Sequence, residues 1–313
     1  MLDRTAGALR HHVFRDLPDL LAPGDLVVVN RSRVFPARLL GSRPDGGEAE
    51  VLLVRPLGGD EWEAMVRPGK RLRPATRVRV DDSLQIEILA APPLGGGKRR
   101  VRLLAADVSA ALERLGHTPL PPYIRRPDRS DDRERYQTVY ARESGSVAAP
   151  TAGLHFTDRV LSRLRERGID LAEVVLHVGP GTFRPVQVED VREHTVPAEP
   201  FLLPEATAAA IARARARKGR VVAVGTTTTR VLEARADPSG EVAAGEGETA
   251  LVIAPPYPFR AVAALVTNFH LPRSSLLLLV SAFAGRERIL AAYAEALRSG
   301  YRFYSYGDAM LLV

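Results

Sequence analysis

The hydrophobic pattern of the chain changes twice along its length, and this change restricts the fold more than any other feature. Between residues 41 and 111, short apolar runs recur at close spacing and are separated by turn-forming residues, as at Pro44-Asp45-Gly46-Gly47. Short strands at this spacing are typical of a sandwich or a barrel. We therefore predict a small all-β domain, with strands over 48–54, 62–66, 76–80, 84–89 and 99–104.

Helix and strand patterns alternate in the rest of the chain. Each expected helix is followed by a glycine, and the helices cover 158–167, 205–218 and 286–299. Strands are expected over 25–30, 171–178 and 220–224, with further apolar runs at 262–267 and 276–280. Such alternation is typical of an α/β domain. Because it flanks the all-β segment, we predict an α/β domain formed by 1–40 and 112–313, with a small β-barrel of residues 41–111 inserted.

The chain is strongly basic. It has 44 Lys and Arg against 37 Asp and Glu, a formal net charge of +7, and its only lysines are Lys70, Lys98 and Lys218. Arginine makes planar, bidentate contacts with phosphates, so an RNA partner is one interpretation. The other interpretation is that a GC-rich or heat-adapted genome favours arginine over lysine throughout. Charge alone does not decide between these interpretations.

Several classes of chemistry and location are excluded or disfavoured. The 313 residues include no cysteine, which excludes disulfides, thiolate metal sites and cysteine nucleophiles. The longest apolar stretch, 274–283, is about half of the ~20 residues that a membrane-spanning helix needs. The first residues contain no basic segment followed by an apolar core. We therefore expect a cytoplasmic protein with no membrane association.

The first unusual segment is 145–157, which is rich in small residues. Its glycines allow a backbone to approach a ligand closely, and it ends in His155 directly before an expected helix. Helix N-termini favour anions. Thr151 and Gly153 are therefore candidate binding residues and His155 a candidate catalytic residue. A tight turn with a packed histidine is the alternative.

The second segment is 176–186, which follows an expected strand. It carries His177 and a Gly-Pro-Gly sequence, but Pro185 prevents an immediate helix and a third glycine is missing. It therefore fails as a dinucleotide fingerprint. The remaining interpretation is a rigid loop that presents His177 to a site. Its candidate binding residues are Gly179, Gly181, Thr182 and Arg184.

The third segment is 221–233, in which a strand passes through a glycine into a helix whose first turn consists of threonines. Hydroxyl groups at a helix N-terminus suit a phosphate, a carboxylate or a ribose at the carboxyl edge of a sheet. Thr226, Thr227 and Arg230 are the candidates. A capped helix with surplus threonines is the alternative.

Two further stretches combine polar and aromatic residues. The first, 265–275, carries Asn268, His270 and Arg273, and the second, 301–310, carries Tyr306 and Asp308. Aromatic faces can stack an adenine or an unpaired RNA base, although a C-terminal strand packed on the core is the ordinary explanation. No group of histidines and carboxylates has metal-ligand spacing, and neither a P-loop nor a Gly-x-Ser-x-Gly motif is present.

Taken together, these segments closely resemble the S-adenosylmethionine:tRNA ribosyltransferase-isomerases of queuosine biosynthesis. The resemblance spans essentially the whole chain. The matching stretches, in chain order, are 16–26, 30–39, 67–70, 116–124, 136–157, 176–186, 224–233, 267–275, 281–285 and 301–310.

The resemblance implies an α/β domain with a mixed sheet and an inserted antiparallel β-barrel. It also implies a reaction. The ribosyl part of S-adenosylmethionine, a co-substrate, moves to 7-aminomethyl-7-deazaguanine at the wobble position of tRNA. There it is isomerised to give epoxyqueuosine, while adenine and methionine leave. No metal or further cofactor is expected.

The chemistry suggests roles for the candidates. A histidine suits the base that removes the proton next to the sulfonium, so His155 and His177 are expected to transfer protons or contact substrate. Thr226, Thr227 and Arg230 would hold the donor, and Asp308 or Glu199 would supply a carboxylate. Contacts to RNA or to the methionine carboxylate are expected from Arg33, Arg38, Arg184 and Arg273. We expect a monomer that binds the anticodon loop.

The chain departs from the family pattern in three places. A strand and an Arg/Ser-containing motif usually precede the position of Leu2, Arg31-Ser32 stands where Asp-Thr is common, and Pro197 precedes Glu199 where a second histidine is frequent. Two alternatives stay open: an S-adenosylmethionine-dependent RNA methyltransferase and a non-catalytic tRNA-binding homologue.

Overall fold

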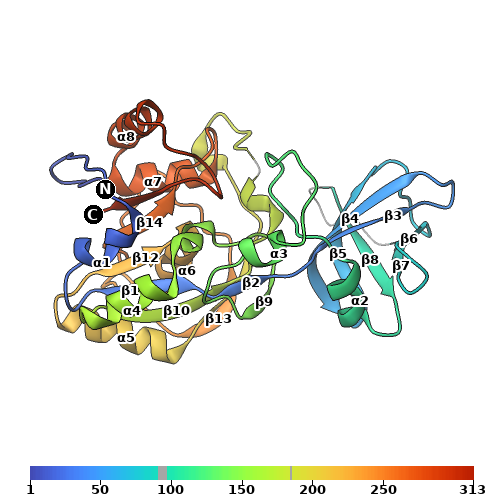
Figure 1. Cartoon of the computed structure of the whole chain (residues 1–313), viewed down its shortest axis with the longest axis horizontal. Helices are drawn as coiled ribbons and strands as arrows, with labels where there is room; N and C mark the ends of the chain where they lie inside the picture. The colour runs from blue at the N-terminus through green and yellow to red at the C-terminus, as the bar shows by residue number, and fades with distance from the viewer. Residues whose placement is uncertain (91–96, 184) are drawn as a thin grey trace. The chain divides into compact units, whose positions relative to one another are not determined.

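The computed structural model describes residues 1–90, 97–183 and 185–313 (Figure 1). The chain forms two compact units. The first contains Met1–Arg33, Gln137–Glu143 and Ala149–Val313, and the second contains Val34–Tyr136 and Ser144–Ala148. The inserted segment expected at 41–111 lies within the second unit. Among the helices in the described ranges, none combines the length and the hydropathy needed to cross a bilayer.

The first unit is built on a seven-stranded mixed sheet. Its strand order is β13 (Gly245–Thr249), β11 (Glu199–Leu203), β10 (Asp170–Leu176), β1 (Leu26–Asn30), β12 (Val221–Val224), β14 (Ala264–Asn268) and β15 (Ala309–Leu312). The four central strands are parallel, and the outer ones pair antiparallel. Every residue of β1, β12 and β14 is buried, as expected where helices cover both faces of a parallel sheet.

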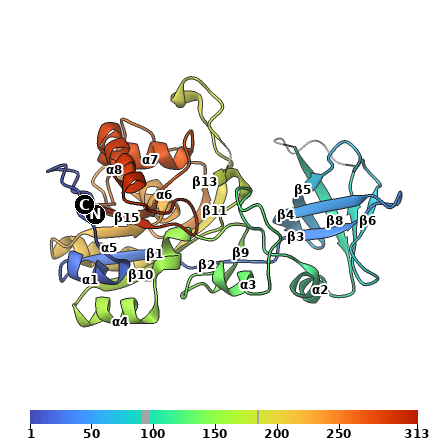
Figure 2. The same cartoon turned by 45° about the horizontal axis from the view of Figure 1, so that its top comes forward.

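The helices of this unit surround the sheet (Figures 1 and 2), and the apolar residues of α4 pack on the face that carries Val27 and Val222. The helices are α1 (Leu17–Leu20), α4 (Asp158–Glu166), α5 (Glu205–Ala216), α6 (Thr226–Arg235), α7 (Ser275–Ala284) and α8 (Arg286–Arg298). Short 3-10 turns are η1 (Phe14–Asp16), η2 (Thr151–His155), η3 (Pro180–Phe183) and η4 (Val191–Glu193).

Local sequence explains where these helices begin and end. The Thr157 hydroxyl accepts a hydrogen bond from Val160 N at 3.3 Å and caps α4, whose apolar residues at 160, 161 and 164 face the core. Ser274 caps α7 in the same way, and Gly285, at φ +88°, ends it. The apolar run 276–280, which fits a strand or a helix by pattern alone, is therefore helical.

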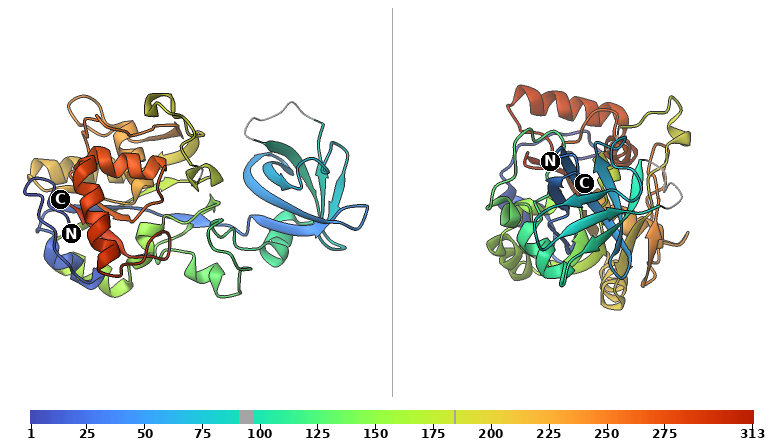
Figure 3. Two further views of the ribbon diagram at one scale, coloured as in Figure 1. Left: turned by 90° about the horizontal axis from the view of Figure 1, so that it is seen from above. Right: turned by 90° about the vertical axis from the view of Figure 1, so that its right-hand side faces the viewer.

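The second unit contains a closed antiparallel barrel, seen in Figure 3. The strand order is β3 (Arg38–Ser42), β4 (Glu48–Gly58), β5 (Glu61–Arg67), β8 (Lys98–Leu104), β7 (Gln85–Ile88) and β6 (Arg77–Arg79). Alternate residues of β4 are buried and pack with Leu39, Ile86 and Val101. The structure thus confirms the predicted fold class, an α/β domain with a mixed sheet and an antiparallel barrel.

Closure of the barrel depends on a glycine. The strands β3 and β6 meet at the pair Ser42–Arg79, and a Cβ on Gly41 would stand 2.5 Å from the Arg79 carbonyl oxygen. Only a residue without a side chain allows this approach. The remaining elements are α2 (Val108–Leu115), α3 (Asp132–Arg135) and a two-stranded sheet of β2 (Ser32–Val34) and β9 (Glu143–Ser146).

Candidate functional site at the carboxyl edge of the sheet

The parallel strands β10, β1, β12 and β14 end at one edge of the sheet, and each is followed by a segment that the sequence singled out. Asn30 ends β1 and connects its neighbours. Its Oδ1 accepts hydrogen bonds from Leu176 N at 3.1 Å and Ser32 N at 3.0 Å. Its Nδ2 donates to Leu176 O at 3.0 Å and to the Thr227 hydroxyl at 3.4 Å. Ligands of open α/β sheets bind at such an edge.

The threonines at the start of α6 divide into two pairs. The hydroxyl of Thr228 donates to Val224 O at 2.7 Å, and that of Thr229 donates to Gly225 O at 3.1 Å. Thr226 and Thr227 are also buried, and they occupy the first turn after Gly225, whose φ of +86° favours glycine. The N-terminal N–H groups of α6 therefore lie at the edge together with these two side chains.

Glu199 and Arg230 form a buried ion pair. Arg230 Nη1 lies 2.5 Å from Glu199 Oε2, and Arg230 Nε donates to Leu251 O at 3.0 Å. The other carboxylate oxygen, Oε1, accepts hydrogen bonds from Gly179 N at 2.8 Å and from the Thr182 hydroxyl at 3.3 Å. The pair thus holds the loop after β10, and each of its two charges is neutralised by the other.

His177 follows β10 directly. Its backbone N–H donates to Pro200 O at 3.0 Å, and its Nδ1 is buried with no hydrogen-bond partner in the part of the chain that the structure describes. Burial lowers the pKa of His177, with a smaller opposing effect from Glu143. The ring is therefore neutral at physiological pH and keeps a nitrogen lone pair, which is the state a general base needs.

His155, at the end of η2, is held on both sides. Its Nδ1 lies 3.2 Å from Ala152 O and its Nε2 lies 2.9 Å from Gly307 O. The ring also stacks on Phe14, with centroids 5.1 Å apart. His155 thus connects η2 to the segment 301–308.

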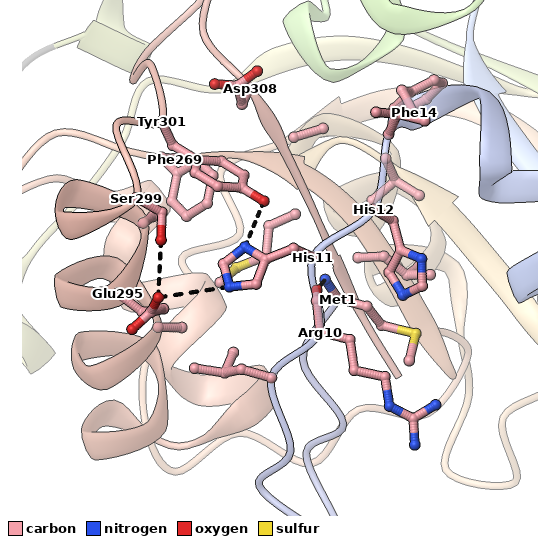
Figure 4. Close-up of a pocket in the computed structure, with 18 of the residues that line it drawn as sticks. Met1, Arg10, His11, His12, Phe14, Phe269, Glu295, Ser299, Tyr301 and Asp308 are labelled. Carbon is pink, nitrogen blue, oxygen red and sulfur yellow. Dashed lines mark hydrogen bonds and ion pairs between the residues drawn. The ribbon is translucent and has the colours of Figure 1, made fainter.

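A cavity of about 420 Å³ lies beside His155, and Asp308 also lines it. Asp308 is half-buried, and its Oδ2 accepts a hydrogen bond from Arg302 N at 2.7 Å. Figure 4 shows His11 in this cavity between Tyr301 and Glu295: His11 Nδ1 lies 2.8 Å from the Tyr301 hydroxyl, and Nε2 lies 3.6 Å from Glu295. Sequence reasoning did not find His11 or Glu295, because neither lies in a segment with an unusual pattern.

The segment after β14 contributes two polar side chains that are already bound internally. The Thr151 hydroxyl donates to Asn268 Oδ1 at 2.9 Å, and Asn268 Nδ2 donates to Tyr304 O at 3.2 Å. His270 Nε2 lies 2.8 Å from the Thr267 hydroxyl, and burial lowers the pKa of His270 to about 3. His270 is therefore a neutral histidine of the core at the end of β14.

The other candidates lie in varied surroundings. Gly153 is buried against Tyr140 and Thr138, while Gly181, which lies beside Pro197, and Tyr306 are half-buried. Arg33 and Arg273 are exposed. Arg38 belongs to the second unit, where it pairs with Glu50 at 2.9 Å. Arg184 lies outside the described residues. Within the ranges that are described, no three histidine and carboxylate side chains are grouped as a metal site.

Comparison with known proteins identifies the family. The model of the family described as "Queuosine biosynthesis protein" matches residues 1–312. The chain belongs to this family. A member of the queuosine biosynthesis family from Moorella thermoacetica, named S-adenosylmethionine:tRNA ribosyltransferase-isomerase, is 53% identical over 100% of this chain and 92% of its own length.

Other relatives agree with this assignment. A protein of the same name from Thermus thermophilus is 53% identical over 97% of this chain and 88% of its own length. The crystal structure of the S-adenosylmethionine tRNA ribosyltransferase from Thermotoga maritima is 36% identical, with a TM-score of 0.53, and the match covers 100% of this chain and 90% of that one. Membership of the queuosine biosynthesis family is thus supported by both sequence and fold.

Proposed function

We propose that this protein transfers the ribosyl part of S-adenosylmethionine to tRNA and isomerises it. The acceptor is the aminomethyl group of 7-aminomethyl-7-deazaguanine at the wobble position, the product is epoxyqueuosine, and adenine and methionine are released. The full-length similarity to ribosyltransferase-isomerases carries the proposal. The meeting of four sequence segments at one edge of the sheet supports it. Both substrates are water-soluble, so we expect the protein to act in the cytoplasm. We also expect it to be a monomer.

His177 is the proposed general base. The sulfonium acidifies the adjacent ribose C–H, and a neutral imidazole in hydrogen-bond reach removes that proton. Burial keeps the ring neutral at physiological pH, and its Nδ1 has no partner in the described ranges. Glu143 favours the imidazolium that forms once the proton is taken. Burial therefore favours the neutral imidazole before proton transfer, and Glu143 favours the imidazolium after it.

The donor's polar ends have matching groups at the same edge. The methionine carboxylate fits the N-terminus of α6, where Thr226 and Thr227 add hydroxyl donors to the free N–H groups. The sulfonium fits the Asp308 carboxylate, which borders the cavity. Thr151 and Asn268, which bind each other, complete the edge on the side of β14. Exposed Arg33 and Arg273 are available for RNA phosphates.

His155, Glu199 and Arg230 are proposed as positioning residues. His155 Nε2 lies 2.9 Å from Gly307 O, and this contact holds the turn that carries Asp308. Glu199 and Arg230 bind each other and the loop that carries His177. All three act through the segments they hold.

The test is an incubation of the protein with S-adenosylmethionine and tRNA bearing 7-aminomethyl-7-deazaguanine, followed by mass analysis. Adenine and epoxyqueuosine in equal amounts are expected. S-adenosylhomocysteine together with a methylated nucleoside would instead identify a methyltransferase. Salt-sensitive tRNA binding without adenine release would identify a non-catalytic homologue.

A further inference from the structure

The segment 67–73, at the end of β5 in the second unit, carries four exposed cations. They are Arg67, Lys70, Arg71 and Arg73. No acidic residue occurs between Glu63 and Asp81 in the sequence. Within the described part of the chain, no carboxylate lies within ion-pairing distance of any of these four side chains. The segment is therefore a local concentration of positive charge that the protein does not neutralise.

Most other basic residues of the barrel strands are neutralised, although Arg99 has no carboxylate partner in the described ranges. Arg102 lies 2.7 Å from Glu61, Lys98 lies 2.5 Å from Glu63, and Arg77 lies 3.9 Å from Glu87. If the arginines only reflected a genomic preference, nothing would separate those of 67–73 from their neighbours. Their lack of carboxylate partners points to a binding role instead.

The segment is held in one conformation by its backbone and by a single buried side chain. Arg71 N donates to Pro68 O at 3.1 Å, and Thr76 N donates to Arg73 O at 3.1 Å. Leu72 is fully buried in the barrel core and anchors the cations on either side of it. Cations on an ordered backbone lose less entropy on binding than cations on a flexible loop, so the segment is suited to a polyanion.

We propose that segment 67–73 contacts the phosphate backbone of the RNA substrate. Arginine and lysine contacts to phosphates position a protein on a nucleic acid without reading its sequence, and they make binding salt-dependent. The identification of this RNA as tRNA rests on the proposed function. It adds the surface of the inserted barrel that holds the tRNA.

The test compares tRNA binding by wild type and by the variant Arg71→Gln/Arg73→Gln, using an unmodified tRNA transcript and fluorescence anisotropy over a range of salt. The variant should bind about tenfold more weakly at physiological salt. The slope of log affinity against log salt should fall by roughly 1.4 to 1.8, since two phosphate contacts are lost. In a separate assay with saturating tRNA that bears 7-aminomethyl-7-deazaguanine, the rate of adenine release should equal that of wild type, because saturation compensates for the weaker binding.

The matched control is Arg159→Gln/Arg165→Gln on α4 in the first unit, which removes the same net charge from two exposed arginines that also have no carboxylate partner in the described ranges. It should leave the salt slope nearly unchanged. Wild-type binding by the 71/73 variant, or an equal loss in both variants, would overturn the proposal. Because the transcript lacks the acceptor base, this result is independent of catalysis. Absent adenine release by wild type would refute the proposed function and leave the binding result standing.

Discussion

Glu199 binds Arg230 with one carboxylate oxygen and the loop after β10 with the other. The distances are 2.5 Å from Glu199 Oε2 to Arg230 Nη1 and 2.8 Å from Oε1 to Gly179 N. Both side chains are about nine-tenths buried, with exposures of 7% and 10%. The charged pair is therefore a structural support directly behind the loop that begins at His177.

Removal of both partners should cost less than the sum of the two single removals. Glu199→Ala leaves a buried guanidinium without its carboxylate, and we expect a loss of about 3–5 kcal/mol in the free energy of unfolding. The double variant Glu199→Ala/Arg230→Met should lose less than the sum of the single variants. Denaturant unfolding of the four proteins in a double-mutant cycle measures this coupling. Strict additivity would show that the two side chains do not stabilise each other.

His177 should control the acid side of the pH–rate profile. Because its pKa is lowered, the ring stays neutral at pH values somewhat below the ordinary value, and turnover should be flat near pH 7 and fall only at lower pH. His177→Ala should lose more than ~10² in turnover and also lose this acid limb. The measurement is kcat/KM for adenine release from pH 5 to 8. An unchanged acid limb in the variant would assign the base elsewhere.

His155 should affect turnover through the segment that it holds. His155→Ala removes the contact to Gly307 O, so the amides of 301–308 should exchange with solvent faster in hydrogen–deuterium exchange. Turnover should fall, while the acid limb of the pH profile stays where it is in wild type. A lost acid limb with unchanged exchange would make His155 the base rather than a positioning residue.

His270 should make the protein less stable in acid. Its pKa is lowered to about 3 by burial, so between pH 6.5 and pH 3 the unfolded chain binds a proton at this residue and the folded chain does not. Unfolding is therefore favoured as pH falls, by about 1.4 kcal/mol per pH unit from this group. The variant His270→Gln should show a shallower loss of stability than wild type from pH 6.5 to 4.5. Parallel curves would contradict the assignment.

Gly41 should be needed for barrel closure. In Gly41→Ala the new methyl group meets the Arg79 carbonyl oxygen at 2.5 Å and Val78 Cγ1 at 2.9 Å, so β3 and β6 must separate. We expect a loss of about 1–3 kcal/mol in thermal or denaturant unfolding. Gly69→Ala is the control, because its Cβ would stand 3.6 Å from the nearest atom, Val66 O. Equal stability of the two variants would refute the closure argument.

Sequence patterns predicted the central elements well, because burial on both faces leaves a strong apolar signal. The helices α4, α5 and α8 and the strands β1, β10 and β12 lie within a few residues of their predicted ranges. The strand β13, Gly245–Thr249, was not predicted, and it lies in a stretch rich in glycine, glutamate and alanine. It has no large apolar side chain at alternate positions, so only its pairing with β11 makes it a strand.

The same limit applies to the candidate site. Segments that follow buried strands were found, because topology alone brings them to one edge. The pairing of Glu199 with Arg230 and the contact of His155 with Gly307 depend on residues far apart in sequence, so no local pattern predicts them. The roles expected for these residues as catalytic or donor-binding groups therefore stay predictions, and the experiments above distinguish them from positioning.

The unusual composition of β13 has a consequence for solubility. β13 is an edge of the seven-stranded sheet, and among the described residues no further strand pairs with its outer side. Such an edge is a template for pairing with a strand of another molecule. Glu246 and Glu248 are both exposed there. A second copy that paired with this edge would bring carboxylates opposite carboxylates, which is unfavourable. The two glutamates that make this strand hard to predict from the sequence thus also disfavour aggregation through this edge.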